Sequence, residues 1–129
     1  MPEAQSLRIL VVDDQRAMRT LIRSTLFAIR CNNVVECGDG NEALSEILLR
    51  PVDLVISDLN MPKLDGLGLL RAVRSNSDIG RLPFIMLTSR GDTELVKQAI
   101  ELGVNNYLIK PFNLVTLKSK IEAVMGPLT

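Results

Sequence analysis

The sequence predicts an α/β protein in which a five-stranded parallel sheet is covered by five helices, some on each face. Short apolar runs rich in β-branched residues alternate five times with longer stretches of helical periodicity. The runs at Leu7–Val12 and Pro83–Leu87 are apolar almost throughout, which is typical of central strands covered on both faces. Five strand–helix units in this order favour a doubly wound sheet.

The five expected strands follow one another with a helix after each. They are Leu7–Val12, Asn33–Cys37, Asp53–Ser57, Pro83–Leu87 and Asn106–Ile109. Right-handed crossovers then bring the C-terminal ends of all strands to one edge of the sheet, where doubly wound proteins carry their sites.

Each expected helix has an apolar face at helical spacing. The residues expected to be buried are Met18, Leu21, Ile22, Leu26 and Ile29 in the first helix; Ala43, Leu44, Ile47 and Leu48 in the second; Leu69, Leu70 and Val73 in the third; Val96, Ala99 and Ile100 in the fourth; and Leu114, Leu117, Ile121 and Val124 in the fifth. Gly103 is expected to end the fourth helix, and Asn113 to cap the start of the fifth. Gly66 is expected to form a tight turn.

Length and composition limit the possible functions. A chain of 129 residues fits one domain, expected at residues 7–129 after a flexible N-terminus at 1–6, with no output domain. The net charge is zero and only three Phe and one Tyr are present, which argues against direct binding of nucleic acid. Neither a targeting segment nor an apolar stretch long enough to span a membrane is visible, so we expect a cytoplasmic protein with Cys31 and Cys37 reduced.

Polar residues follow four of the expected strands. Asp13 and Asp14 come after the first strand, Asp58 after the third, Thr88 after the fourth and Lys110 after the fifth. Three carboxylates close together repel one another, and a hard divalent cation such as Mg²⁺ relieves that repulsion. Cation and lysine together suit a phosphoryl group. The nucleophile would then be a carboxylate, and Asp58 is favoured because it stands alone on a central strand.

These motifs resemble a known family. The quoted residues are Val11-Val12-Asp13-Asp14, Asp58-Leu59-Asn60-Met61-Pro62 with Asp65-Gly66, Leu87-Thr88-Ser89, and Lys110-Pro111-Phe112. In this order, each at a strand end, they resemble the receiver domain of two-component response regulators, and most of all its stand-alone, CheY-like members. The resemblance runs from Leu7 to about Met125 and implies the flavodoxin-like strand order 2-1-3-4-5.

The resemblance assigns roles around the phosphoacceptor. It implies that Asp58 takes a phosphoryl group from a phosphohistidine of a sensor kinase or histidine phosphotransfer protein. Asp13, Asp14, Asp58 and the backbone carbonyl of Asn60 would bind Mg²⁺ or Mn²⁺. Lys110 would contact the phosphoryl group, through a cis Lys110–Pro111 bond.

The same resemblance implies a switch. Thr88 would bond to the phosphoryl group after transfer, and the ring of Tyr107 would follow it inward. The fourth helix, fifth strand and fifth helix would then be recognised by a partner protein. Asn60 and Arg90 would flank the hydrolytic water and tune dephosphorylation. Such a chain is a monomeric signalling switch that catalyses only its own phosphorylation and dephosphorylation.

Several interpretations remain open at this point. Asp13 and Asp14 could cap a helix, and Asp58 could begin a turn. Thr88 could be an ordinary strand-end residue or form an ST-turn, and Lys110 could be a solvated surface lysine. Tyr107 fits core packing as well as switching. The output could be a flagellar motor switch protein, which we favour, or a phosphorelay or a phosphate sink, or the chain could be a receiver excised from a larger regulator.

Two other classes are disfavoured. A flavodoxin-like cofactor binder would need a Gly-rich loop where this sequence has Asp13-Asp14-Gln15-Arg16. An aspartyl-phosphate phosphatase usually carries a second aspartate at the position of Asn60.

Overall fold

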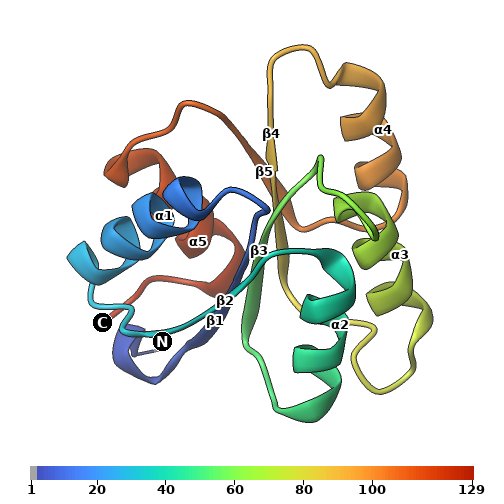
Figure 1. Ribbon diagram of the computed structural model, residues 1–129. Coiled ribbons are helices and arrows are strands. Elements are labelled where there is room, and N and C mark those ends of the chain that lie inside the picture. Colours follow the sequence, from blue (N-terminus) through green and yellow to red (C-terminus); the bar gives the residue numbers. More distant parts are fainter. Residues whose placement is uncertain (1–2) are drawn as a thin grey trace.

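The computed structural model describes residues 3–129 and places five strands in one parallel sheet (Figure 1). The strands are β1 (Arg8–Val12), β2 (Asn33–Cys37), β3 (Leu54–Asp58), β4 (Phe84–Thr88) and β5 (Asn106–Ile109). Their order, β2-β1-β3-β4-β5, confirms the predicted doubly wound topology. In the register of the central pairs Val12 lies opposite Ser57, and Asp58 opposite Leu87, so the strands end nearly level.

Five helices cover the sheet in two layers. They are α1 (Arg16–Ala28), α2 (Gly40–Leu49), α3 (Gly66–Ser75), α4 (Thr93–Glu101) and α5 (Leu114–Met125). Figure 1 shows α1 and α5 on one face and α2, α3 and α4 on the other. Alternate residues of β1 supply the two cores: Ile9 and Val11 pack in the cluster under α1 and α5, and Leu10 and Val12 in the cluster under α2 to α4.

Four residues that were expected to be buried lie at the surface. Leu21 is 51% exposed, Leu48 and Ile100 are each 56% exposed, and Leu114 is 40% exposed. Three of them directly follow or precede a fully buried residue of the same helix: Leu21 precedes Ile22, Leu48 follows Ile47 and Ile100 follows Ala99. Successive helical residues point about 100° apart, so a helix that meets the core along a narrow stripe turns one of two adjacent side chains outward, whereas α3 buries both Leu69 and Leu70. The apolar faces predicted for α1, α2 and α4 were therefore too wide.

The predicted helix ends at Gly103 and Asn113 are confirmed. Gly103 has a φ of +89°, and its N–H donates to the carbonyl of Ile100 while the N–H of Val104 donates to Ala99. This pair of bonds closes α4 in a Schellman motif, which needs the left-handed conformation at Gly103. The side chain of Asn113 accepts a hydrogen bond from the N–H of Thr116 and caps α5.

Part of the N-terminal segment is more ordered than the sequence suggested. Residues 1–6 were expected to be flexible, yet Ala4–Ser6 form a short 3₁₀-helix and Ala4 is buried. The N–H of Ala4 donates to the carbonyl of Thr129 at 3.2 Å, so both ends meet beside α1 and α5 (Figure 1). Residues 1–2 lie outside the described residues. Within residues 3–129 no helix is both long enough and apolar enough to cross a membrane.

Candidate functional site

The site residues predicted from the sequence meet at the edge where the strands end, at the top of the sheet in Figure 1. Asp58 is the last residue of β3 and Thr88 the last of β4. Asp13 and Asp14 follow β1, and Lys110 follows β5. One carboxylate oxygen from each of Asp13, Asp14 and Asp58 lies within 4.8 Å of the others. Carboxylates from the end of β3 and from the turn after β1 therefore surround one small volume.

Lys110 is the cation of this cluster. Its Nζ lies 2.9 Å from Oδ1 of Asp58 and 3.5 Å from Oδ2 of Asp13. The backbone N–H of Lys110 donates to the carbonyl of Thr88 at 2.8 Å, which extends the pairing of β4 and β5 into the site. The Lys110–Pro111 peptide bond is cis, as expected from the resemblance. The ion pairs with Asp58 and Asp13 hold the lysine side chain toward the acids rather than toward solvent.

Burial and mutual repulsion shape the ionisation of the site. Asp58 is 8% exposed, and burial raises its pKa; the bond from Lys110 opposes this, and the charge of Asp13 adds to it. Burial lowers the pKa of Lys110, but its bonds to Asp58 and Asp13 outweigh this and leave that pKa raised. Three carboxylates face one ammonium group, so the site carries excess negative charge.

The donor set fits a hard divalent cation. Within the described residues, Asp13, Asp14 and Asp58 are a group of carboxylates that could hold a metal ion. Carboxylate oxygens, without sulfur or imidazole, suit Mg²⁺ or Mn²⁺. A bound cation would neutralise the charge that Lys110 alone leaves unbalanced.

Thr88 brings an unpaired hydroxyl to the site. The residue is 1% exposed, and its Oγ1 has no hydrogen-bond partner in the part of the chain that the structure describes. A buried hydroxyl without a partner costs about 1–3 kcal/mol and calls for an explanation. Thr88 could donate to a new acceptor placed above Asp58 and Lys110.

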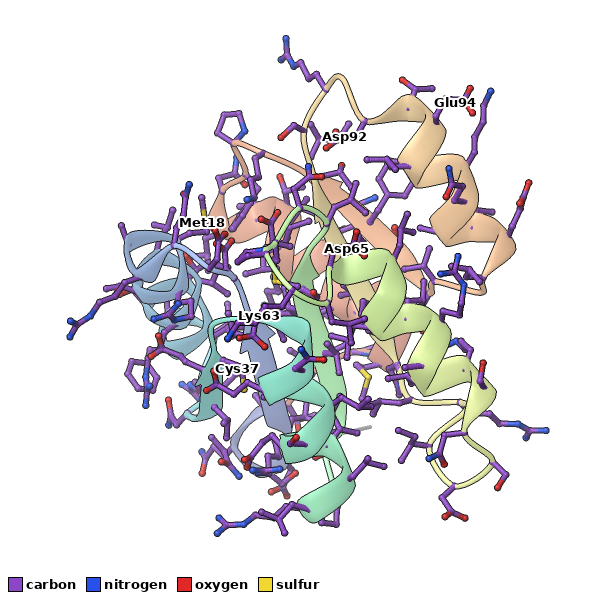
Figure 2. All side chains as sticks on the ribbon, turned by 45° about the vertical axis from the view of Figure 1, so that its right-hand side comes forward. Met18, Cys37, Lys63, Asp65, Asp92 and Glu94 are labelled. Carbon is purple, nitrogen blue, oxygen red and sulfur yellow. The ribbon has the colours of Figure 1, made fainter. Side chains whose placement is uncertain are left out.

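The start of α3 packs tightly under Asp58. The N–H of Gly66 donates to the carbonyl of Leu59, and Asp65 caps the helix by accepting from the N–H of Gly68 (Figure 2). A Cβ on Gly66 would lie 2.4 Å from the carbonyl oxygen of Asp58. The sequence interpretation of Gly66 as a tight-turn glycine therefore needs correction: glycine is required here by the close approach of helix to strand.

The loops beyond β3 and β4 carry the remaining predicted residues. Asn60 and Arg90 are both exposed, two residues after Asp58 and Thr88 respectively. Asp92 accepts from the N–H of Ser89 and shapes the loop before α4 (Figure 2).

Tyr107 connects the site to the surface. It is half-buried and lines a cavity of about 280 Å³ between β4, β5 and α4 that also includes Thr88 and Arg90. Nζ of Lys120, on α5, lies 5.7 Å from the centre of the tyrosine ring. Thr88 and Tyr107 therefore border the same cavity.

Two contributions were missed from the sequence. The N–H of Gln15 donates to Oδ1 of Asp13 at 2.9 Å, and Nη1 of Arg19 donates to the backbone carbonyl of Asp13 at 2.7 Å. The contact of Gln15 is made by its backbone N–H, which every residue except proline has, so the residue type does not reveal it. Arg19 lies within a helix, where arginine is ordinary, so no sequence signal would single it out.

The fold and this site define a receiver domain. The family model described as "Response regulator receiver domain" matches residues 9–122, and the chain belongs to that family. It is a signalling module rather than a conventional enzyme.

Within that family, chemotaxis proteins are similar over nearly the whole length. The chain is 43% identical over 128 residues to the "Probable chemotaxis protein CheY" of Rhizobium etli, covering 99% of both chains. It is 40% identical to "Chemotaxis protein CheY1" of Helicobacter pylori, covering 93% of this chain and 98% of that one. The structure of CheY4 of Vibrio cholerae aligns with a TM-score of 0.84 at 33% identity, covering 92% of this chain and 98% of that one.

Proposed function

We propose that Asp58 accepts a phosphoryl group from the phosphohistidine of a sensor kinase or histidine phosphotransfer protein. The observation that carries this proposal is the buried Asp58 carboxylate, 2.9 Å from Lys110 and grouped with Asp13 and Asp14. Asp13, Asp14, Asp58 and the carbonyl of Asn60 would hold Mg²⁺, which supplies charge neutralisation to the phosphoryl oxygens when bound.

The transfer is a direct displacement. An oxygen of Asp58 attacks phosphorus in line with the P–N bond of the phosphohistidine. The P–O bond forms as the P–N bond breaks, and the electron pair of that bond stays on the imidazole nitrogen. Lys110, already aimed at Asp58, pairs with a phosphoryl oxygen. Water later attacks phosphorus, releasing phosphate and restoring the carboxylate.

The response follows from the unpaired hydroxyl. Thr88 donates to a phosphoryl oxygen, the loop at Ser89–Thr93 closes over it, and Tyr107 turns toward the space that Thr88 leaves. The surface formed by α4, β5 and α5 then changes. Because the chain has one tyrosine and no tryptophan, its tyrosine fluorescence reports on Tyr107 alone.

The output we propose is control of a flagellar motor switch protein. The similarity to chemotaxis proteins of Rhizobium etli and Helicobacter pylori, which match this chain nearly end to end, supports this choice. A phosphorelay step or a phosphate sink would use the same site. Binding of the phosphorylated chain, but not of Asp58→Asn, to a motor switch protein supports the first output. Onward transfer to a phosphotransfer histidine supports the relay.

The lifetime of the phosphorylated state is assigned to Asn60 and Arg90. Both are exposed on the loops that follow β3 and β4, and we propose that they flank the approach of water to the phosphoryl group. The guanidinium of Arg90 is proposed to slow that approach. An Arg90→Ala variant should lose its phosphoryl group faster, measured as decay of the phosphorylated mass after donor removal; an unchanged rate contradicts this role.

The test of the proposal is intact mass after incubation with acetyl phosphate and Mg²⁺. We expect a gain of one phosphoryl group that needs Mg²⁺ and is absent from Asp58→Asn. Circular dichroism should show that this variant remains folded. A phosphoryl group on Asp58→Asn, or none on the wild type even with phosphoramidate, contradicts the assignment.

A further inference from the structure

We infer that Arg19 is a positioning residue for the metal site: it fixes the peptide that joins Asp13 to Asp14 and thereby aims the carboxylate of Asp14. This inference rests on the proposed function, since it concerns the same metal site. Arg19 touches neither carboxylate according to the contacts of the described residues, and it would act only through the backbone.

The turn after β1 is short and needs outside support. Only residues 13–15 separate Val12, the end of β1, from Arg16, the start of α1. The N–H of Asp13 donates to the carbonyl of Cys37 at 3.1 Å, and its Oδ1 accepts from Gln15. The carbonyl of Asp13 is held from another direction, by Nη1 of Arg19 at 2.7 Å.

That carbonyl sets the position of the next residue. A peptide group is planar, so fixing the C=O of Asp13 also fixes the N–Cα bond of Asp14. Asp14 is exposed, and within residues 3–129 no hydrogen bond to its carboxylate is seen. Its place in the cluster therefore depends on the backbone that carries it. Without Arg19, rotation of this peptide would move Asp14 relative to Asp13 and Asp58.

Arg19 is itself anchored. Its Nε lies 3.3 Å from Oε1 of Glu36 on β2, and Oε2 of Glu36 lies 2.8 Å from Nη1 of Arg23. The Arg19 side chain is only 19% exposed. Figure 2 marks Met18 on α1 and Cys37 on β2, the chain neighbours of Arg19 and Glu36. The contact thus ties α1 and β2 to the turn between β1 and α1.

The positive charge of Arg19 and its positioning of the Asp13 carbonyl have opposite effects on the affinity of the site for a cation. A guanidinium near the site repels a cation, so removing it would tighten metal binding if charge alone mattered. If Arg19 positions Asp14, removing it weakens binding instead. The two explanations therefore predict opposite signs.

Arg23 provides the matched control. It pairs with the same carboxylate of Glu36 and carries the same charge, but no contact between it and Asp13 is seen. Arg23→Met therefore removes one positive charge from the same network and leaves the Asp13 carbonyl held.

The experiment measures the Kd of Mn²⁺ by electron paramagnetic resonance for the wild type, Arg19→Met, Arg19→Lys and Arg23→Met. We expect binding to weaken about tenfold in Arg19→Met, the low end of the range for residues that orient metal ligands. Arg23→Met should stay within about twofold of the wild type, since the exposed charge it removes is screened by salt. Arg19→Lys should fall between, because an ammonium group cannot reach both the Asp13 carbonyl and Glu36 as a guanidinium does.

Urea unfolding of each variant separates a folding defect from a local one, and the amide ¹⁵N–¹H resonances of Asp14 and Gln15 should shift in Arg19→Met more than in Arg23→Met. Mn²⁺ bound equally or more tightly by folded Arg19→Met overturns the inference. Failure of the wild type to bind Mn²⁺ would instead contradict the metal site of the proposed function.

Discussion

The two edges of the sheet differ in how completely their charged and polar side chains are paired within the chain. At the edge where the strands begin, Arg8 and Arg74 each donate to several acceptors of the chain. Arg8 pairs with Glu46 at 2.6 Å and donates to the carbonyl of Pro51, while its backbone N–H donates to Asp53. At the opposite edge three carboxylates share Lys110, and the hydroxyl of Thr88 has no partner among the described residues.

Arg74 shows how the first edge is stabilised. Its guanidinium donates to the carbonyls of Leu82, Gly103 and Gly80 and to Oδ1 of Asn105, over distances of 2.7 to 3.2 Å. It thus joins the end of α3 to the loops that enter β4 and β5. The difference between the edges is therefore one of pairing: the arginines where the strands begin donate to several acceptors within the chain, while at the other edge three carboxylates share one ammonium group.

Among the substitutions, the largest expected effect on stability comes from removing Arg74. Arg74→Met leaves four acceptors without this donor and should lower the free energy of unfolding by about 2 kcal/mol. Phosphorylation of the folded protein at Asp58 should be unchanged, because the two edges are separate. Urea denaturation measures the first quantity and intact mass the second. Arg71→Met, an exposed arginine of the same helix, is the control. If Arg74→Met lost phosphorylation but kept its free energy of unfolding, the two edges would not have the separate roles described above.

A smaller effect of opposite sign is expected at Asp58. Because burial raises the folded pKa of Asp58, the native state binds the proton more tightly than the unfolded chain does. The free energy of unfolding of the metal-free wild type therefore falls as pH rises from the unfolded value, about 3.9, through the raised folded pKa. Asp58→Asn lacks this titration.

The measurement is urea denaturation with EDTA across that pH range. Asp58→Asn should be more stable than the wild type at neutral pH, and the difference should grow from acid toward neutral pH. A stability difference that does not change with pH would contradict the raised folded pKa of Asp58 as the cause.

The smallest expected change in the free energy of unfolding comes from a substitution at the end of α1. Arg30, at the end of α1, has a φ of 69°, and its N–H donates to Phe27 while that of Cys31 donates to Leu26. This is the position of a Schellman motif where glycine is preferred. Arg30→Gly should raise the free energy of unfolding by about 0.5–1 kcal/mol, because a side chain in the left-handed region costs about 1–2 kcal/mol. Arg30→Ala, measured in the same way, should give no such gain.

The sequence was most informative where a polar residue interrupts an apolar strand. Asp13, Asp58, Thr88 and Lys110 could be placed at one edge because strand direction and right-handed crossovers fix where strands end. Membership of α1 could not show that Arg19 reaches the Asp13 carbonyl, since a long side chain chooses its partner only in the folded chain. Roles of this kind depend on backbone acceptors, which every residue has.

Helix faces were predicted less well for a related reason. Leu21, Leu48 and Ile100 are apolar, and apolar character alone suggested burial. The surface against which each helix packs decides which of two adjacent apolar residues turns inward, and that surface is made by other elements. Gly66 was likewise noticed, but the carbonyl of Asp58 that excludes a Cβ could be identified only from the folded structure.

The most direct test of the account is the effect of Mg²⁺ on stability. If the acidic edge is completed by a divalent cation, Mg²⁺ at about 100 times its Kd should raise the free energy of unfolding by about 2.7 kcal/mol. NaCl at matched ionic strength should not reproduce the gain, Asp58→Asn should lose most of it, and Arg74→Met should keep it. A wild type whose urea midpoint is the same with Mg²⁺ and with NaCl would contradict the claim that this edge is built to hold a cation.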